Sequence, residues 1–159
     1  FHYITALTRK QIEILVRKQI LQYELFDGPV CEIVDDSVRY IVRRNPIRAQ
    51  EIQENRKSKK CSVESLVEEQ NKYLQEHRGA KETTALKRVT GKINKLKVDG
   101  WLSVTVEDRK LILHVDNNTL AEEMKLDGCY VIKTDLQKAE CDTQTVHSRY
   151  KDLALVLFM

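Results

Sequence analysis

The sequence predicts an α+β fold made of short β-hairpins and a long antiparallel helical hairpin. Three observations support this prediction: short runs of alternating or β-branched apolar residues towards both ends, apolar stripes at helical spacing in the middle, and turn or capping residues at the boundaries. The chain has 159 residues, of which 42% are hydrophobic, so it is long enough to bury a sizeable core.

The first element is a strand in residues 1–7, followed by a short amphipathic helix. Thr8 and Gln11 have the spacing of a capping box, in which each side chain accepts a hydrogen bond from the backbone N–H of the other residue. The apolar residues after the box recur on one helical face, at Ile12, Leu15, Val16 and Ile20. A turn is expected at residues 25–29, because Gly28 supplies an unusual backbone angle and the following proline prevents a helix from continuing.

Two short strands and a long helix are expected next. Residues 31–34 and 38–42 are rich in β-branched and aromatic side chains, and the Asp-Asp-Ser sequence between them favours a tight reversal. Asn45 can accept hydrogen bonds from free backbone N–H groups, and Pro46 is best tolerated in a first helical turn. A helix is therefore expected to run from this pair towards His77.

Two helices are expected to pair in the middle of the chain, because each carries an apolar stripe. The first stripe consists of Val63, Leu66, Val67, Gln70, Tyr73 and Leu74. The second stripe, past Gly79, consists of Leu86, Val89, Ile93 and Leu96. The stripes do not separate two interpretations: an arm that presents basic side chains to DNA or packs against a second protomer, and a hairpin that only closes on itself.

A second hairpin, a short helix, a strand and a final helix complete the prediction. The hairpin has one buried face, with Trp101 at its edge. That face consists of Leu102, Val104, Val106, Leu111, Leu113 and Val115. The short helix is expected from about Thr119 to Leu126, and Gly128 can adopt the left-handed cap before the next strand. Asp142 is expected to cap the final helix. The apolar face of that helix consists of Val146, Tyr150, Leu153 and Leu157.

Basic residues gather in two parts of the chain, although the net charge is only +3. The clusters contain Arg39, Arg43, Arg44, Arg48, Arg56, Lys57, Lys59 and Lys60, then Lys87, Arg88, Lys92, Lys95 and Lys97. Such clusters can neutralise phosphates and release counterions, which is the sequence-independent part of DNA affinity. The candidate DNA-binding residues are Arg43, Arg44, Arg48, Arg56, Lys57, Lys59, Lys60, Arg88, Lys92 and Lys95. The alternative is a solvated helix face on which nearby glutamates offset the lysines.

The residues indicate no complete active site or metal centre within this chain. The four cysteines and four histidines are scattered, so neither a disulfide framework nor a zinc site is expected, and the thiols should be reduced. Asp35, Asp36 and Asp116 fit turns and strand ends better than catalysis. No apolar run approaches the ~20 residues of a membrane helix, and the start has no signal-like core, so we expect a cytoplasmic protein.

Three segments, taken in order, resemble one family. Residues 1–7 form a strand, the run from Leu126 to Leu136 is a strand that starts with Asp-Gly, and the run from Val146 to Val156 opens a helix that contains Tyr150. The last two segments resemble the approach to the final catalytic glutamate in bacterial insertion-sequence transposases of the DDE class, in the family-4 group with a ribonuclease-H-like fold. The first segment is similar to the strand that follows the family's second catalytic aspartate.

The resemblance implies a partial ribonuclease-H-like core, with an insertion domain between its last strand and its final helix. Family members use two aspartates and one glutamate to hold two Mg²⁺ ions for DNA cleavage and strand transfer. Both aspartates would lie upstream of Phe1. The family spacing from Tyr150 places Leu153 at a basic position and Leu157 at the glutamate. We therefore expect a transposase fragment that is inactive alone and has no cofactor of its own, cut before one catalytic region and diverging or frameshifted at the other.

The same resemblance implies a domain division and partners. Residues 1–24 would be the last core strand and its helix, residues 25–126 the insertion domain with the helical pair at 46–98, and residues 127–159 the strand and the truncated final helix. Transposon-end DNA is the implied partner. Self-association is also expected, because a missing central sheet would leave apolar faces exposed. The alternative function is a non-enzymatic helical hairpin that binds a partner protein or DNA.

Overall fold

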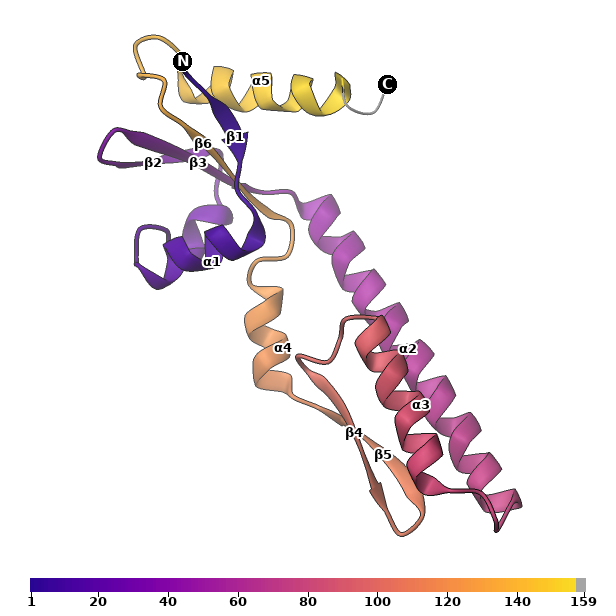
Figure 1. Ribbon diagram of the computed structural model, residues 1–159. Coiled ribbons are helices and arrows are strands. Elements are labelled where there is room, and N and C mark those ends of the chain that lie inside the picture. The colour runs from indigo at the N-terminus through magenta and orange to yellow at the C-terminus, as the bar shows by residue number, and fades with distance from the viewer. Residues whose placement is uncertain (157–159) are drawn as a thin grey trace. The chain divides into compact units, whose positions relative to one another are not determined.

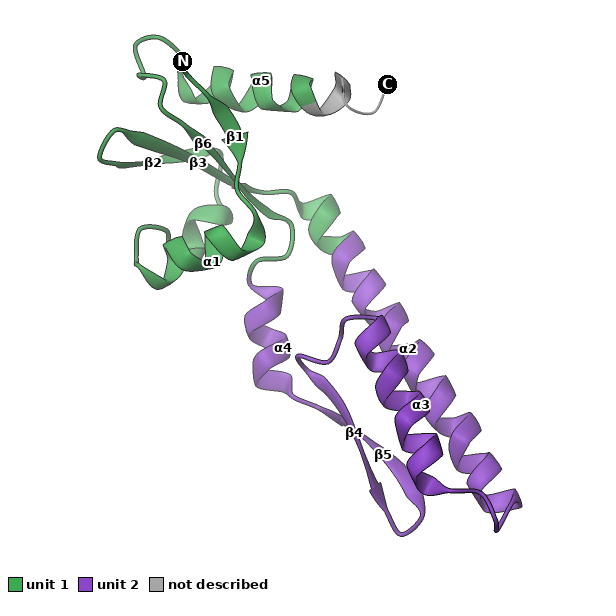
Figure 2. Ribbon diagram, in the orientation of Figure 1, with its two compact units in different colours: residues 1–50, 126–159 green, residues 51–125 purple. Residues whose placement is uncertain are grey.

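The chain combines helices with antiparallel strands (Figure 1), which confirms the α+β prediction. The computed structural model describes residues 1–156, with side chains described for residues 1–153. The chain divides into two compact units (Figure 2). Unit 1 contains residues 1–50 and the segment that begins at Leu126, and unit 2 contains residues 51–125.

Unit 1 is built on a four-stranded antiparallel sheet with the strand order β1-β6-β3-β2. Its strands are β1 (Ile4–Ala6), β2 (Cys31–Asp35), β3 (Val38–Arg44) and β6 (Cys129–Thr134). β6 lies between β1 and β3: Thr134 is opposite Ile4, and Ile132 is opposite Ile41. The opening strand and the strand that follows Asp-Gly, far apart in sequence, are therefore neighbours in the sheet.

Helices cover both faces of this sheet, because successive residues of a strand point to opposite sides. On one face, α1 (Arg9–Arg17) and the 3₁₀ helix η1 (Tyr23–Phe26) share a core with Tyr40 and Val42. On the other face, α5 (Thr143–Val156) packs Val146 into a core with Ile41 (Figure 1). Neighbouring residues of β3 thus belong to two separate cores.

Capping residues set the helix boundaries in unit 1. Thr8 and Gln11 form the predicted capping box of α1. The Asp142 carboxylate caps α5 and accepts a hydrogen bond from the Thr145 N–H at 2.7 Å, as predicted. α1 ends at Arg17, so the prediction that Ile20 continues its helical face is wrong.

Gly128 has the left-handed backbone that the sequence predicts, whereas Gly28 does not. The φ angle of Gly128 is 71°, and Gly28 has no positive φ. A Cβ atom at Gly128 would lie 2.4 Å from the Asn45 carbonyl oxygen and 2.8 Å from the Ala49 backbone nitrogen. The expected turn at residues 25–29 is in part the 3₁₀ helix η1, so it needs no unusual glycine angle.

A buried ion pair joins the β2–β3 hairpin to the start of α5. The Arg39 guanidinium donates hydrogen bonds to the Glu32 carboxylate at 2.6 and 3.1 Å, and the Thr143 hydroxyl donates to the same carboxylate. Arg39 also donates to the carbonyl oxygens of Leu136 and Cys141, both at 2.8 Å. The hydrogen bond from Arg39 lowers the pKa of Glu32 below its ordinary value. Arg39, a member of the first basic cluster, therefore has a structural role.

Unit 2 packs two long helices against a β-hairpin. Its elements are most of α2 (Pro46–Glu76), α3 (Glu82–Lys95), β4 (Leu102–Glu107), β5 (Lys110–Val115) and α4 (Asn117–Met124). Its buried core consists of Val63, Val67, Leu74, Ala85, Val89, Ile93, Val98, Trp101, Leu102 and Leu111. Apart from Tyr73, which is exposed, the apolar stripes of α2 and α3 are buried or half-buried within unit 2, where the helical pair closes on its own hairpin.

Two polar side chains hold this hairpin to α2. The Asn71 side chain accepts a hydrogen bond from the Leu111 N–H at 2.7 Å and donates one to the Leu111 carbonyl oxygen at 3.0 Å. Arg109 donates to three carbonyl oxygens at or just beyond the end of α2, those of Leu74, His77 and Arg78. These carbonyls lack partners within the helix, so Arg109 serves as a cap supplied by the hairpin turn.

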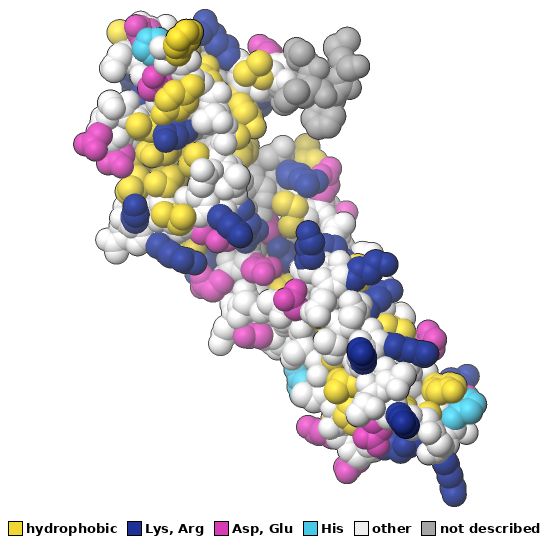
Figure 3. All heavy atoms as spheres, in the orientation of Figure 1, with side chains coloured by type: hydrophobic (Ala, Val, Ile, Leu, Met, Phe, Trp, Pro, Cys, Tyr) yellow, Lys and Arg dark blue, Asp and Glu magenta, His cyan; other side chains and the backbone are white. Residues whose placement is uncertain are grey.

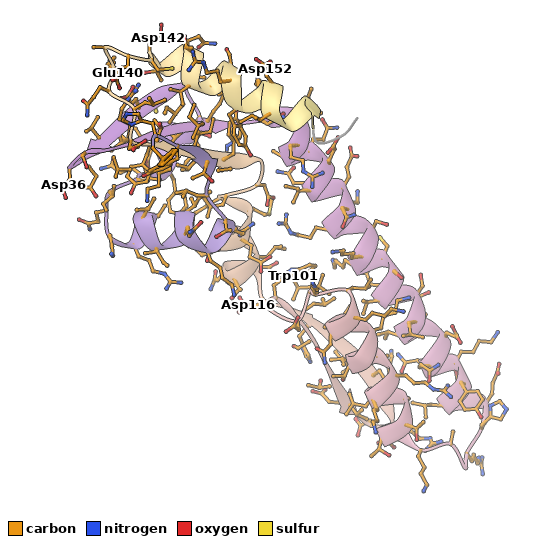
Figure 4. The ribbon with its side chains drawn as sticks, turned by 45° about the horizontal axis from the view of Figure 1, so that its top comes forward. Asp36, Trp101, Asp116, Glu140, Asp142 and Asp152 are labelled. Carbon is orange, nitrogen blue, oxygen red and sulfur yellow. The ribbon has the colours of Figure 1, made fainter. Side chains whose placement is uncertain are left out.

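Two boundaries differ from the sequence expectations. α4 begins before Thr119, because the Asp116 carboxylate accepts hydrogen bonds from the N–H groups of Asn118 and Thr119. Figure 4 shows Asp116 beside Trp101, whose carbonyl oxygen accepts from the Asp116 N–H at 2.8 Å. The β2–β3 hairpin belongs to the sheet of unit 1 through its pairing with β6, whereas the family resemblance implied an insertion domain over residues 25–126.

Candidate nucleic-acid interface

Three predicted DNA-binding residues, Arg43, Arg44 and Arg48, lie in unit 1. Arg43 is half-buried at the end of β3, opposite Tyr130. The Arg44 guanidinium forms an ion pair with Asp27 at 3.0 Å and donates to the Asp127 carbonyl oxygen at 3.2 Å. Arg48 is exposed in the first turn of α2. Arg43 and Arg44 are therefore engaged in the packing of unit 1, and Arg48 is the exposed cation of the three.

Four more predicted residues lie along α2 in unit 2: Arg56, Lys57, Lys59 and Lys60. Lys57 is exposed and the other three are half-buried. The Lys60 ammonium group forms an ion pair with the Glu64 carboxylate one turn later, at 3.4 Å. Solvent-accessible pairs of this kind are weak, so Lys60 can exchange Glu64 for a phosphate at little cost.

The last three predicted residues, Arg88, Lys92 and Lys95, form a row that we call the α3 basic row. Spacings of four and three residues place them along one face of α3. In the part of the chain that the structure describes, none of the three forms an ion pair or a side-chain hydrogen bond. Figure 3 shows Lys and Arg side chains, in dark blue, along the α2–α3 pair. The α3 basic row therefore carries positive charge that is not paired with a carboxylate of the described residues.

A groove of about 160 Å³ between α2 and α3 adjoins this row, and we call it the Gln70 groove. Its lining residues are Gln70, Tyr73, Leu74, Ala80, Lys81, Thr84, Ala85 and Arg88. At its rim the exposed Tyr73 ring stacks on the His77 ring, with centroids 4.2 Å apart. Helical spacing predicts Gln70 and Tyr73 as part of the apolar stripe and does not predict the groove. The available signal was a polar amide at a core position of that stripe.

A larger pocket, of about 750 Å³, lies between α2 and the β4–β5 turn. Its charges are mixed, because Glu68 and Asp108 line it together with lysines and arginines. Two of its polar side chains, Asn71 and Arg109, already bond to backbone groups. This pocket is therefore less suited to an anion than the Gln70 groove.

The described carboxylates do not converge on a metal site. Figure 4 shows Asp36 in the β2–β3 turn and Asp152 along α5, apart from Asp142 at the start of that helix. Among the described residues, no group of three His, Cys, Asp or Glu side chains is arranged to hold a metal ion. Leu157, which the family spacing matches to the glutamate, lies outside the described residues. The side chain of Leu153 is 53% exposed, so this end of the apolar face of α5 is not buried in the core that contains Val146.

Tyr130 of β6 and His147 of α5 form a hydrogen-bonded pair. The Tyr130 hydroxyl lies 2.6 Å from His147 Nε2, and the two rings are stacked with centroids 5.9 Å apart. Burial lowers the pKa of His147, and the positive charges of Lys151 and Arg43 lower it further. Burial also raises the pKa of the nearby Cys129 thiol to about 11, so this thiol is not a ready nucleophile. The Tyr130–His147 pair therefore belongs to the packing of unit 1, and both of its side chains stay neutral near pH 7.

The stability of unit 1 is expected to fall as the pH drops from about 7.5 to 5.5, by up to ~1.4 kcal/mol per pH unit. Because the folded pKa of His147 is below its unfolded value of 6.5, the unfolded chain binds the proton first on acidification. Urea unfolding at the two pH values measures the loss. In His147→Phe this dependence should nearly disappear, and an unchanged dependence would assign the titration to another group.

No family model, curated protein or solved structure compared with this chain matches it. The resemblance to transposases therefore rests on the three sequence segments alone. None of the helices in residues 1–156 has the length and the apolar character needed to cross a membrane.

Proposed function

We propose that this chain is part of a DDE-type DNA transposase with a ribonuclease-H-like core, and that its helical pair contacts the DNA of the transposon end. In this proposal, unit 1 belongs to the wall of the active site and unit 2 is an inserted domain. Catalysis would need carboxylates from the rest of the transposase. The chain alone would be inactive.

The observation that carries the proposal is the pairing of β1 with β6. These strands contain two of the three family-like segments, and more than 120 residues separate them in the chain. They nevertheless lie side by side, with Ile4 opposite Thr134 and Ala6 opposite Ile132. When a second domain is inserted into a core, the chain leaves the core after one strand and must return to the same core afterwards. Pairing of the strands before and after the insertion is the arrangement expected in that case.

The third family-like segment lies on the same sheet. α5 contributes Val146 and the half-buried Tyr150 to the core that contains Ile41 and Ile132. In the family, the helix that contains this tyrosine also carries the final glutamate, next to the sheet that carries the aspartates. The order strand, insertion, strand, helix therefore supports the proposal.

Mg²⁺ is the metal of the proposed parent family, where it is held by carboxylates and activates the attacking oxygen. The described residues do not fit such a site, since they contain no converging set of three carboxylate, histidine or cysteine ligands. We therefore assign no metal-dependent step to this chain. Its part in the reaction would be to bind and orient DNA.

The packing of unit 2 weighs against a helical hairpin that binds a partner protein through its seam. The seam residues Val63, Val89 and Ile93 are almost fully buried within unit 2. A partner helix could reach them only if the β4–β5 hairpin were displaced. DNA contact through the exposed basic residues needs no such change.

Binding of the purified chain to labelled duplex DNA tests the DNA contact. Over about 50 to 200 mM salt, log K should fall linearly, with a slope of about −0.9 for each phosphate neutralised. With Mg²⁺ present, we expect binding without strand cleavage. Absence of binding at low salt would contradict the DNA contact, and cleavage would contradict the expected inactivity.

The flanking DNA sequence tests the transposase assignment itself. The proposal predicts an aspartate-bearing strand encoded upstream of Phe1 and a glutamate codon, in one of the reading frames, near codon 157. If the flanking DNA encodes neither, DNA binding would instead support a simple DNA-binding module.

A further inference from the structure

We infer that the Gln70 groove binds one phosphate of a nucleic-acid backbone, with the Gln70 amide and the Thr84 hydroxyl donating hydrogen bonds and with Lys81 and Arg88 supplying positive charge. This inference rests on the proposed DNA contact of the helical pair and identifies one point at which that contact is made. Four features of the groove support it.

The first feature is a buried polar side chain without a protein partner. Gln70 is 4% exposed and lines the groove, yet its amide forms no hydrogen bond with any described residue. The side chain as a whole is buried, but its amide atoms are not fully enclosed, so they remain open to the groove. Its neighbours on the stripe, Val67 and Leu74, are apolar and offer it no partner through their side chains. An amide N–H group that faces a groove is a suitable donor to a phosphate oxygen.

The second feature is the sign of the charge. Lys81 and Arg88 are the charged side chains that line the groove, and neither forms an ion pair in the described part of the chain. No carboxylate lines it. Thr84 adds a hydroxyl that can donate to an anion. A groove with two cations, a hydroxyl and an unpaired amide is complementary to an oxyanion.

The third feature is size together with position. Pockets for small ligands commonly have volumes of roughly 300–1,000 Å³. The Gln70 groove, at about 160 Å³, suits one group of a longer ligand. Arg88 also begins the α3 basic row, which continues for about 10 Å along the helix to Lys95. A linear polyanion can therefore place one phosphate in the groove and the following ones along the row.

The fourth feature separates nucleic acid from an anionic membrane. Membrane-surface helices place large apolar side chains beside their basic residues. Among the described residues of α3, none is a large exposed hydrophobic. The groove rim instead carries the stacked Tyr73 and His77 rings, which offer a flat surface to a sugar or an unstacked base. These observations favour a nucleic-acid ligand.

The test compares two charge-matched variants of the full chain, Arg88→Gln and Lys87→Gln. Both remove one positive charge from adjacent positions of α3, but only Arg88 lines the groove. Fluorescence anisotropy with labelled duplex DNA should show about tenfold weaker binding for Arg88→Gln at low salt. Its salt slope should be smaller in magnitude by about 1. Lys87→Gln should stay within about twofold of the wild type.

A second measurement addresses Gln70 directly. The side-chain amide resonances of Gln70 in the wild-type chain should shift when duplex DNA is added. Gln70→Leu, which is of similar size, should fold with a melting transition no lower than that of the wild type and bind DNA more weakly.

The outcomes separate this inference from the proposed function. If the wild type binds DNA but Arg88→Gln equals Lys87→Gln, or the Gln70 resonances do not move, the inference is overturned and the DNA contact stands. If the wild type binds no DNA at low salt, both are overturned, and binding to phosphatidylserine vesicles alone would replace DNA with a membrane surface.

Discussion

Replacing Gly128 with alanine is expected to lower the free energy of unfolding of unit 1 by about 2–5 kcal/mol. Two effects add. The φ angle of 71° is strained for a residue with a Cβ atom, and that atom would lie 2.4 Å from the Asn45 carbonyl oxygen and 2.8 Å from Ala49. Both of these neighbours are fixed at the junction of β3 and α2, so neither can move aside without disturbing the sheet. Small domains are stable by only about 5–15 kcal/mol, so this is a large fraction of the total.

Hydrogen exchange of the β3 and β6 amides, with urea unfolding followed by circular dichroism, measures this loss. Gly91→Ala is the matched control. Gly91 lies within α3, has no positive φ, and has open space where a Cβ atom would be added. That substitution should stabilise the helix by about 0.5–1 kcal/mol. Equal effects of the two substitutions would mean that the close approach at Gly128 does not constrain the fold.

Replacing Arg39 with alanine is expected to destabilise unit 1 by about 3–5 kcal/mol. The substitution leaves the Glu32 carboxylate buried without its cation, and it removes the donor to the carbonyl oxygens of Leu136 and Cys141. Those two carbonyls lie in the segment between β6 and α5, so α5 should loosen first. Urea unfolding gives the total loss, and hydrogen exchange in α5 identifies where it begins.

Arg9→Ala is the control for the loss of an arginine. The Arg9–Glu13 pair has a similar separation, 3.1 Å, but both side chains are exposed, so its loss should cost less than about 1 kcal/mol. The Glu32 contribution should also depend on pH. Because the folded pKa of Glu32 is lowered from 4.5, its contribution is present above that pH and is lost as the pH falls through the folded pKa. An Arg39→Ala variant as stable as Arg9→Ala would show that the buried pair contributes no more than an exposed one.

Helix starts and the left-handed glycine could be predicted from the sequence, because they depend on residues that lie within a few positions of each other. The capping box at Thr8, the start of α2 at Asn45-Pro46 and the cap at Asp142 all came from side chains that bond to a backbone group at most three residues away. The left-handed angle at Gly128 followed for the same reason. The crowding that makes this glycine difficult to replace comes from Asn45 and Ala49, about eighty residues earlier, and no local pattern contains it.

The roles of the basic residues depended on packing. Arg39, Arg44 and Arg88 look equivalent in sequence, yet Arg39 is buried against Glu32, Arg44 pairs with Asp27, and Arg88 lines a groove. A carboxylate on the neighbouring strand β2, seven residues earlier, decided the first role, and a helix that returns beside α2 decided the last. Charge clustering alone therefore does not distinguish an arginine that packs within unit 1 from one that lines a groove.

The sequence by itself determined the α+β class, the approximate extent of the helices and strands, and the position of the helical pair, because periodicity and capping act over one or two turns of chain. Only the tertiary structure decided that β6 lies between β1 and β3, that the β2–β3 hairpin belongs to unit 1, and that the Gln70 amide faces a cationic groove. Strand partners and buried neighbours are chosen by the summed packing of residues that are distant in sequence. That information is not contained in any local window of the chain.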